Sequence, residues 1–146
     1  MKIFVTVGTT PFEKLIREAS LIDSAEIILQ VAESNFQSQN CKIIKFTKNI
    51  NNYYMWADVV ICHAGAGTIY KLLEMNKLII VVPNLDRIDH HQNEIANFVE
   101  LNNYGIVVRD LKTLKEGLLK INTFKKYKYE KEEFFLTKKI IDLIQC

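Results

Sequence analysis

The sequence predicts an α/β protein with a mostly parallel sheet, a Rossmann-like three-layer sandwich formed by residues 1–146 as a single domain. Two observations carry this prediction. Residues 59–62 and 78–82 are apolar without alternation, which is typical of strands buried on both faces of a sheet. Such runs alternate along the chain with segments whose apolar residues recur at helical spacing, as parallel strands joined by helices require.

Apolar spacing places the elements of the first half of the chain. Residues 12–19 repeat apolar positions at intervals of three and four, which predicts a helix. Pro11 suits its first position, and Thr10 is a possible N-cap. The aromatic residues of segment 50–56 have the same spacing and predict a short helix, whose rings either stack on a base or sugar or close the core. Strands are expected at residues 2–7, 26–32, 42–46 and 59–62, with a polar loop at 33–40.

The second half repeats the pattern of strand, turn and helix. A helix is expected to follow the glycine-rich turn at residues 63–68, and another to begin at Asp89 as N-cap. A basic–aromatic run occupies residues 125–131, and the C-terminal segment 124–146 is expected to end in an amphipathic helix. The other expected elements are strands at 78–82 and 106–108 and helices at 89–102, 111–119 and 134–144.

Composition excludes several classes of protein. The net charge of +2 is too small to indicate nucleic-acid binding. The three cysteines are scattered without a C-x-x-C pair, so we expect reduced thiols and a cytoplasmic protein. The chain enters a strand directly at its start, which argues against a signal peptide, and no apolar run reaches the roughly 18 residues of a membrane span.

The segment from His63 to Thr68 is the strongest functional motif. It turns a buried strand into a helix, so it places free backbone N–H groups and the positive end of a helix at the carboxyl edge of the sheet. Gly65 and Gly67 have no Cβ and would let the oxygens of an anion, most often a phosphate, approach the backbone. The alternative is an ordinary strand-to-helix turn that binds nothing, because a lone G-x-G is a weak signal.

Two further turns are expected at the same edge of the sheet. Gly8 and Thr9 follow the first strand, and a polar group with His91 and Gln92 opens the helix after residues 78–82. A tight turn that simply needs a glycine explains Gly8 equally well. No P-loop, complete dinucleotide fingerprint or G-x-S-x-G motif is present, and the spacing of the cysteines and histidines matches no familiar zinc pattern.

Three motifs together resemble one family. They are VTVGTTPFEKLI at the start, HAGAGT in the middle, and IIVVPN followed by DHHQNEIA, in order over about residues 1–110. They resemble nucleotide-sugar glycosyltransferases related to the bacterial N-acetylglucosaminyltransferase of peptidoglycan lipid synthesis. The resemblance is closer to small single-domain members, namely the soluble catalytic subunit of the dolichol-linked UDP-N-acetylglucosamine transferase and its bacterial capsule and exopolysaccharide homologues.

The resemblance implies the C-terminal, donor-binding half of a GT-B fold and a role for each motif. His63 would line the crevice, and Gly8 and Thr9 would face the acceptor side. His91 and Gln92 would contact the transferred sugar as the catalytic pair. The donor diphosphate would meet Gly65, Ala66, Gly67 and Thr68. The UDP-sugar is then a substrate, and no cofactor or metal is implied; the chain also has no D-x-D pair to hold a metal.

One position departs from the family pattern. Relatives often read GAG[ST]-x-x-E, with a glutamate that would hold the ribose hydroxyls, whereas Lys71 stands there in this chain. Glu74 follows one turn later and could substitute, or Lys71 could pair with the diphosphate. A solvated lysine on an exposed helix face is the simpler alternative.

The family also implies a partner, because this chain corresponds to one half of the fold. We expect a membrane-anchored protein that supplies the acceptor domain, a lipid-linked acceptor, and a position at the inner membrane face through that partner. The final helix and residues 125–131 are candidates for the contact, or they pack on their own domain. A non-catalytic accessory subunit, or a nucleotide-binding regulatory module, is the alternative function.

Overall fold

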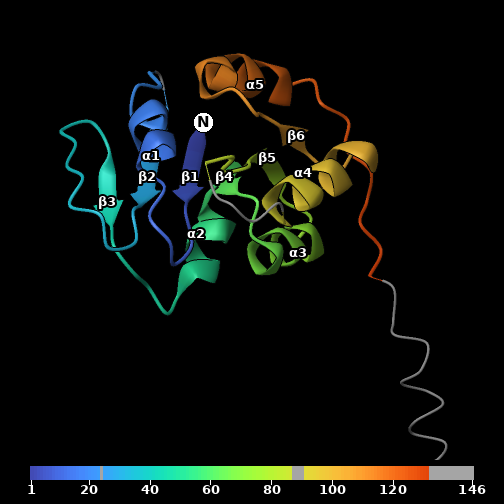
Figure 1. The fold of residues 1–146 in the computed structure, drawn as a ribbon, viewed down its shortest axis with the longest axis horizontal. Coiled ribbons are helices and arrows are strands. Elements are labelled where there is room, and N and C mark those ends of the chain that lie inside the picture. The colour runs from blue at the N-terminus through green and yellow to red at the C-terminus, as the bar shows by residue number, and fades with distance from the viewer. Residues whose placement is uncertain (24, 87–90, 132–146) are drawn as a thin grey trace, which may run out of the picture.

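The computed structural model describes residues 1–23, 25–86 and 91–131. Its centre is a six-stranded sheet with the order β3-β2-β1-β4-β5-β6, in which every pair is parallel (Figure 1). The strands are β1 (Lys2–Thr6), β2 (Glu26–Gln30), β3 (Lys42–Ile44), β4 (Val59–His63), β5 (Leu78–Val82) and β6 (Ile106–Val107). The prediction of a Rossmann-like α/β fold is therefore confirmed, although most strands end one or two residues earlier than expected.

Helices cover both faces of this sheet, as the unbroken apolar runs of the central strands require. One core cluster packs α1 (Glu13–Ala19) and α5 (Leu114–Ile121) against one face, and the second packs α2 (Ile50–Trp56), α3 (Ala66–Glu74) and α4 (His91–Leu101) against the other (Figure 1). Side chains of β4 alternate between the two clusters, so β4 is buried on both sides.

The start of α1 differs from the sequence-based expectation. The helix begins at Glu13, and no side chain caps it, so the assignments of Pro11 as its first residue and Thr10 as its N-cap are wrong. Phe12 explains the shift, because its ring is buried in the core while its backbone, with φ −133° and ψ 71°, is not helical. Burial of this ring outweighs the local preference for starting a helix at proline.

The segment expected to be one helix at residues 111–119 consists of two elements. A 3₁₀ turn, η1 (Leu111–Thr113), is capped by Asp110, whose carboxylate accepts a hydrogen bond from the backbone N–H of Lys112 at 3.0 Å. α5 then continues to Ile121, so Gly117 lies in the middle of the helix and not near its end. A Cβ at Gly117 would stand 2.8 Å from Val108, which shows that this glycine allows α5 to approach the sheet.

The aromatic residues of α2 belong to the core. Tyr54 is 3% exposed, and the ring of Tyr53 stacks on Phe4 with centroids 5.2 Å apart. Of the two interpretations, closing the core is therefore confirmed for these rings, and not stacking on a base or sugar.

The basic–aromatic run at 125–131 forms neither helix nor strand and is anchored to the rest of the domain. Tyr129 meets Tyr104 edge-on at 5.5 Å, and the N–H of Tyr127 donates to the carbonyl of Asn103 at 2.9 Å. The N-cap predicted at Asp89 and the helix predicted at 134–144 lie outside the described residues.

Candidate functional site

The strand order creates a switch point between β1 and β4. The chain moves outward from β1 through β2 to β3 and then returns to the other side of β1 with β4. Connections from β1 and β4 therefore leave the sheet toward opposite faces, and a crevice opens at their carboxyl ends, where ligands bind in open α/β sheets. The two glycine-containing turns predicted from the sequence, at Gly8 and at Gly65, follow these two strands.

The imidazole of His63 lies between these two turns. Gly8 has a left-handed backbone with φ +68°, and a Cβ added there would stand 2.8 Å from His63 Cε1. A Cβ on Gly65 would stand 2.3 Å from His63 Nε2. Both glycines thus make room for one side chain of this protein, whereas Gly67 has open space on its Cβ side, as the approach of a ligand would require.

A hollow of about 380 Å³ opens next to His63 at this edge of the sheet. It is bounded by the chain after β1, by the start of α3 and by the start of α4. Five of the predicted site residues line it: His63, Gly65, Ala66, His91 and Gln92. The lining residues that sequence analysis did not select are Thr10, Phe12, Ala64, Asn84, Glu94 and Ile95.

The start of α3 brings backbone donors to this hollow. Gly65 is the N-cap, with φ −84° and ψ 125°, and no side chain among the described residues caps the helix. The first N–H groups of a helix have no partner within it, and the helix dipole gives this end a partial positive charge. Since Gly65 and Ala66 line the hollow, the site is suited to an anionic group.

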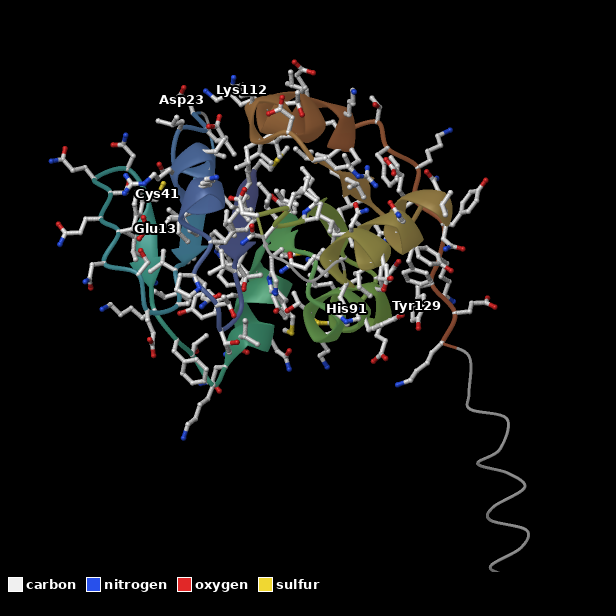
Figure 2. All side chains as sticks on the ribbon, in the orientation of Figure 1. Glu13, Asp23, Cys41, His91, Lys112 and Tyr129 are labelled. Atoms are coloured by element: carbon white, nitrogen blue, oxygen red, sulfur yellow. The ribbon has the colours of Figure 1, made fainter. Side chains whose placement is uncertain are left out.

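The start of α4 contributes the polar side of the hollow. Gln92 Oε1 accepts a hydrogen bond from the backbone N–H of Asn84 at 2.9 Å, which ties the chain after β5 to α4. His91 is exposed, and its Nδ1 lies 3.4 Å from Glu94 Oε2. His91 is the first residue of α4, and Figure 2 shows it on the side of the molecule toward which the strands of Figure 1 point. His91 and Gln92 thus line the same hollow as the start of α3.

Thr68 has a different environment from its predicted neighbours. Its side chain lies close enough to the phenol of Tyr54, which comes from α2, to oppose in part the rise in the pKa of that phenol. Burial, more than the nearby Cys62, raises the pKa of Tyr54 to about 12, so the phenol stays protonated at neutral pH. Burial likewise raises the pKa of the Cys62 thiol to about 12, which leaves this thiol unsuited to nucleophilic or metal chemistry.

The structure places the other predicted residues outside the main hollow. Gly8 and Thr9 line a second hollow of about 280 Å³ together with Ala32, Glu33, Lys45 and Phe46. Lys71 is exposed on α3. Glu74 lies in its last turn, about 12 Å along the axis from Ala66 at a rise of 1.5 Å per residue. Its Oε1 is 3.0 Å from Lys131 Nζ, so the C-terminal stretch occupies this carboxylate.

Some of the missed residues left a signal in the sequence. Asn84 and Thr10 each lie just after a predicted strand, and Glu94 is one turn after His91. Phe12 gave no such signal, because an aromatic residue at helical spacing indicates the core.

Among the described residues no three potential metal ligands come together. None of the described helices is long and apolar enough to cross a membrane.

Comparisons with known proteins agree with this geometry. The family model described as glycosyltransferase family 28 C-terminal domain matches residues 2–145. A curated relative from Vesicomyosocius okutanii, the UDP-N-acetylglucosamine–N-acetylmuramyl-(pentapeptide) pyrophosphoryl-undecaprenol N-acetylglucosamine transferase, is 27% identical over 122 residues, 78% of this chain and 36% of that protein. The human UDP-N-acetylglucosamine transferase subunit ALG13 is 34% identical over 110 residues, 64% of this chain and 10% of that protein. This chain thus spans 36% or less of the length of these relatives.

Solved structures show the same fold. The solution structure of ALG13 has a TM-score of 0.64 at 20% identity and covers 99% of this chain and 97% of that one. The crystal structure of MurG from Acinetobacter baumannii has a TM-score of 0.62 at 18% identity and covers 99% of this chain and 49% of that one. The fold is therefore that of a GT-B domain, as the three sequence motifs predicted.

Proposed function

This chain belongs to the glycosyltransferase family 28 C-terminal domain family, and we propose that it is the donor-binding subunit of a UDP-sugar-dependent glycosyltransferase. One observation carries the proposal. The uncapped start of α3, at Gly65 and Ala66, opens into the hollow at the switch point of the sheet, opposite His91 and Gln92. Backbone donors for a diphosphate and side chains for a sugar therefore share one site.

The chemistry follows from this arrangement. When a UDP-sugar transfers its sugar, the bond between the anomeric carbon and the β-phosphate oxygen breaks, and negative charge grows on the departing diphosphate. Backbone N–H groups at the start of α3 stabilise that charge more strongly in the transition state than in the ground state, which is what accelerates the reaction. His91 and Gln92 would hold and orient the sugar. No residue of this chain is assigned as the base that activates the acceptor.

A second protein completes the proposed enzyme. We propose that a membrane-anchored partner supplies the acceptor domain, because the matching family model is described as a C-terminal domain and the human relative ALG13 is named as a transferase subunit. The acceptor would be a lipid-linked saccharide of capsule or exopolysaccharide synthesis. The subunit would then work at the cytoplasmic face of the membrane through this partner. Co-purification with a membrane-anchored neighbour tests this point, and efficient transfer by this chain alone contradicts it.

A thermal-shift series with nucleotides tests donor binding. UDP, UDP-N-acetylglucosamine and UDP-glucose are compared with ADP and GDP at matched concentrations. A ligand that binds only the folded state at about 100 times its Kd adds about 2.7 kcal/mol, which raises the Tm of a domain of this size by roughly 5–10 °C. UDP and at least one UDP-sugar should produce this shift. Equal rises in Tm with UDP, ADP and GDP would contradict the proposal, and so would an unchanged Tm at millimolar UDP.

A non-catalytic accessory subunit is the second candidate. It is favoured by Lys71, which stands where relatives often carry an acidic residue, and by the ion pair that holds Glu74 on Lys131. Transfer assays on the complex separate the two functions. If the chain is the donor-binding subunit, His91→Ala and Gln92→Ala abolish transfer while the complex still assembles. Unchanged transfer by both variants would favour the accessory role.

A further inference from the structure

Gln30 is a buried polar residue that sequence analysis treated only as part of a strand. It ends β2, is 3% exposed, and all of its side-chain partners lie at the carboxyl edge of the sheet. Its Oε1 accepts hydrogen bonds from Thr6 Oγ1 at 2.7 Å, the N–H of Val7 at 3.2 Å and the N–H of Gly8 at 3.1 Å. Its Nε2 donates to the carbonyls of Gly8 at 2.9 Å and Lys45 at 2.8 Å.

This amide holds the Gly8 turn from both sides. It accepts from the N–H of Gly8 and donates to the carbonyl of the same residue, so it fixes the two peptide groups that flank this Cα. Gly8 has φ +68°, a left-handed conformation outside the extended geometry of β1. A fully bonded buried polar network rigidifies the groups that it joins, because leaving any member unpaired is costly. Gln30 therefore sets where the chain leaves β1.

The Gly8 turn in turn limits the space of His63. The Cβ position of Gly8 is 2.8 Å from His63 Cε1, so the backbone of this turn forms one wall against the imidazole. The opposite wall is the Gly65 turn, and the ring itself lines the main hollow. A displacement of Gly8 would therefore be passed to a side chain of the candidate site without any change in α3 or α4.

We propose that Gln30 is a positioning residue, whose amide fixes the Gly8 turn and thereby the place of the His63 imidazole at the donor hollow. The effect on donor affinity rests on the proposed function, whereas the effect on His63 does not. If Gln30 only pairs with backbone groups at the strand ends, its replacement would lower stability without moving His63.

The test uses Gln30→Leu, which keeps the size of the side chain and removes all five hydrogen bonds. Ile28→Ala is the matched control, because Ile28 is a buried residue on the same strand and the same face of the sheet, away from Gly8. The first readout is the imidazole Cε1–H resonance of His63 in the full chain, which has only three histidines. The second is the Kd for UDP, measured by calorimetry on the same samples.

We expect Gln30→Leu to move the His63 resonance and the Gly8 amide resonance and to leave His91 in place. UDP affinity should fall by about tenfold or more, while Ile28→Ala changes neither readout even if its Tm falls as far. An unmoved His63 resonance in folded Gln30→Leu overturns the positioning role. A moved resonance with unchanged UDP affinity overturns its importance for the donor hollow, although Gln30 would still place His63. If the wild type binds no UDP but His63 still moves, the link to His63 stands and the proposed function fails.

A second variant covers loss of folding. Gln30→Glu retains the acceptor oxygen for Thr6, Val7 and Gly8 but replaces the amide N–H groups that bond to the carbonyls of Gly8 and Lys45. It should also move the His63 resonance, because a carboxylate oxygen in place of the amide nitrogen repels the carbonyls of Gly8 and Lys45. In the wild type, the side-chain NH₂ protons of Gln30 should exchange slowly with solvent; rapid exchange of both would contradict the network outright.

Discussion

Two glycines of one turn should respond in opposite ways to the same substitution. At Gly65 an alanine Cβ would stand 2.3 and 2.9 Å from two ring atoms of His63, closer than real Cβ contacts, and 3.1 Å from a third, which is tighter than most such contacts. Gly65 has φ −84° and ψ 125°, which alanine adopts without strain, so the cost is the clash alone. At Gly67, inside α3, an added Cβ meets nothing within 4 Å. The pair therefore separates crowding from backbone effects.

The expected free energies follow from these contacts. Overpacking at Gly65 costs about 1–3 kcal/mol, offset by about 0.4–1 kcal/mol from a less flexible unfolded chain. We expect Gly65→Ala to lower the free energy of unfolding by about 1–2 kcal/mol, or the Tm by about 2–8 °C. Gly67→Ala should raise the free energy of unfolding by about 0.4–1 kcal/mol. Urea and thermal unfolding of both variants measure this difference, and a Gly65→Ala variant as stable as Gly67→Ala would refute the reasoning.

The same pair tests the proposed donor site. The family resemblance places the diphosphate at Gly67, whose Cβ side is open, so Gly67→Ala should be more stable than the wild type and yet bind UDP more weakly. Calorimetry with UDP measures the affinity. Unchanged affinity in Gly67→Ala would show that the diphosphate does not lie over Gly67.

Three further predictions concern residues around the site. The pKa of Tyr54 is raised to about 12 from 10.0, so the folded state keeps its proton more tightly, and stability present below pH 10 should be lost as the pH rises toward 12. Tyr54→Phe should flatten this fall in the free energy of unfolding, measured with urea at pH 9.5–11. An unchanged dependence on pH would contradict the assignment of the fall to Tyr54. Cys62 adds a fall of the same sign that begins near pH 9. Lys71→Glu should leave UDP affinity measurable, and complete loss in calorimetry would instead place Lys71 on the diphosphate. Glu74→Gln should leave UDP affinity unchanged, because Glu74 lies outside the hollow and pairs with Lys131; a marked loss would show that it reaches the nucleotide.

Burial patterns made the sheet predictable. Residues 59–62 and 78–82 are apolar on both faces because helices cover both, and this signal is local and strong. The start of α1 was not predictable in the same way. Whether the helix begins at Pro11 or at Glu13 depends on where the Phe12 ring finds a place in the core, and that place is made by residues distant in the sequence.

The site was predictable to the extent that it depends on strand ends. Parallel strands deliver their following turns to one edge, so the sequence alone was enough to expect His63, Gly65 and His91 together, and they share one hollow. Side-chain partners were not predictable, since the closeness of Thr68 to Tyr54 and the hydrogen bond between Gln92 and Asn84 depend on rotamers and packing. Gln30 was missed because a lone glutamine in an apolar strand looks the same whether it faces solvent or a network.

The two glycine turns and His63 form one steric unit, which leads to a last prediction. Gly8 and Gly65 belong to motifs far apart in the sequence, yet each lacks a side chain where the same imidazole lies. If the ring is the cause, His63→Ala should remove the penalty of Gly65→Ala, so the double variant should be about as stable as His63→Ala alone, with a coupling free energy of about 1–2 kcal/mol. At Gly8 the rescue should be only partial, because alanine at φ +68° remains strained even without the ring. Unfolding of the double-variant cycles measures both couplings. Additive effects at Gly65, or full rescue at Gly8, would show that the backbone and not His63 dictates these glycines.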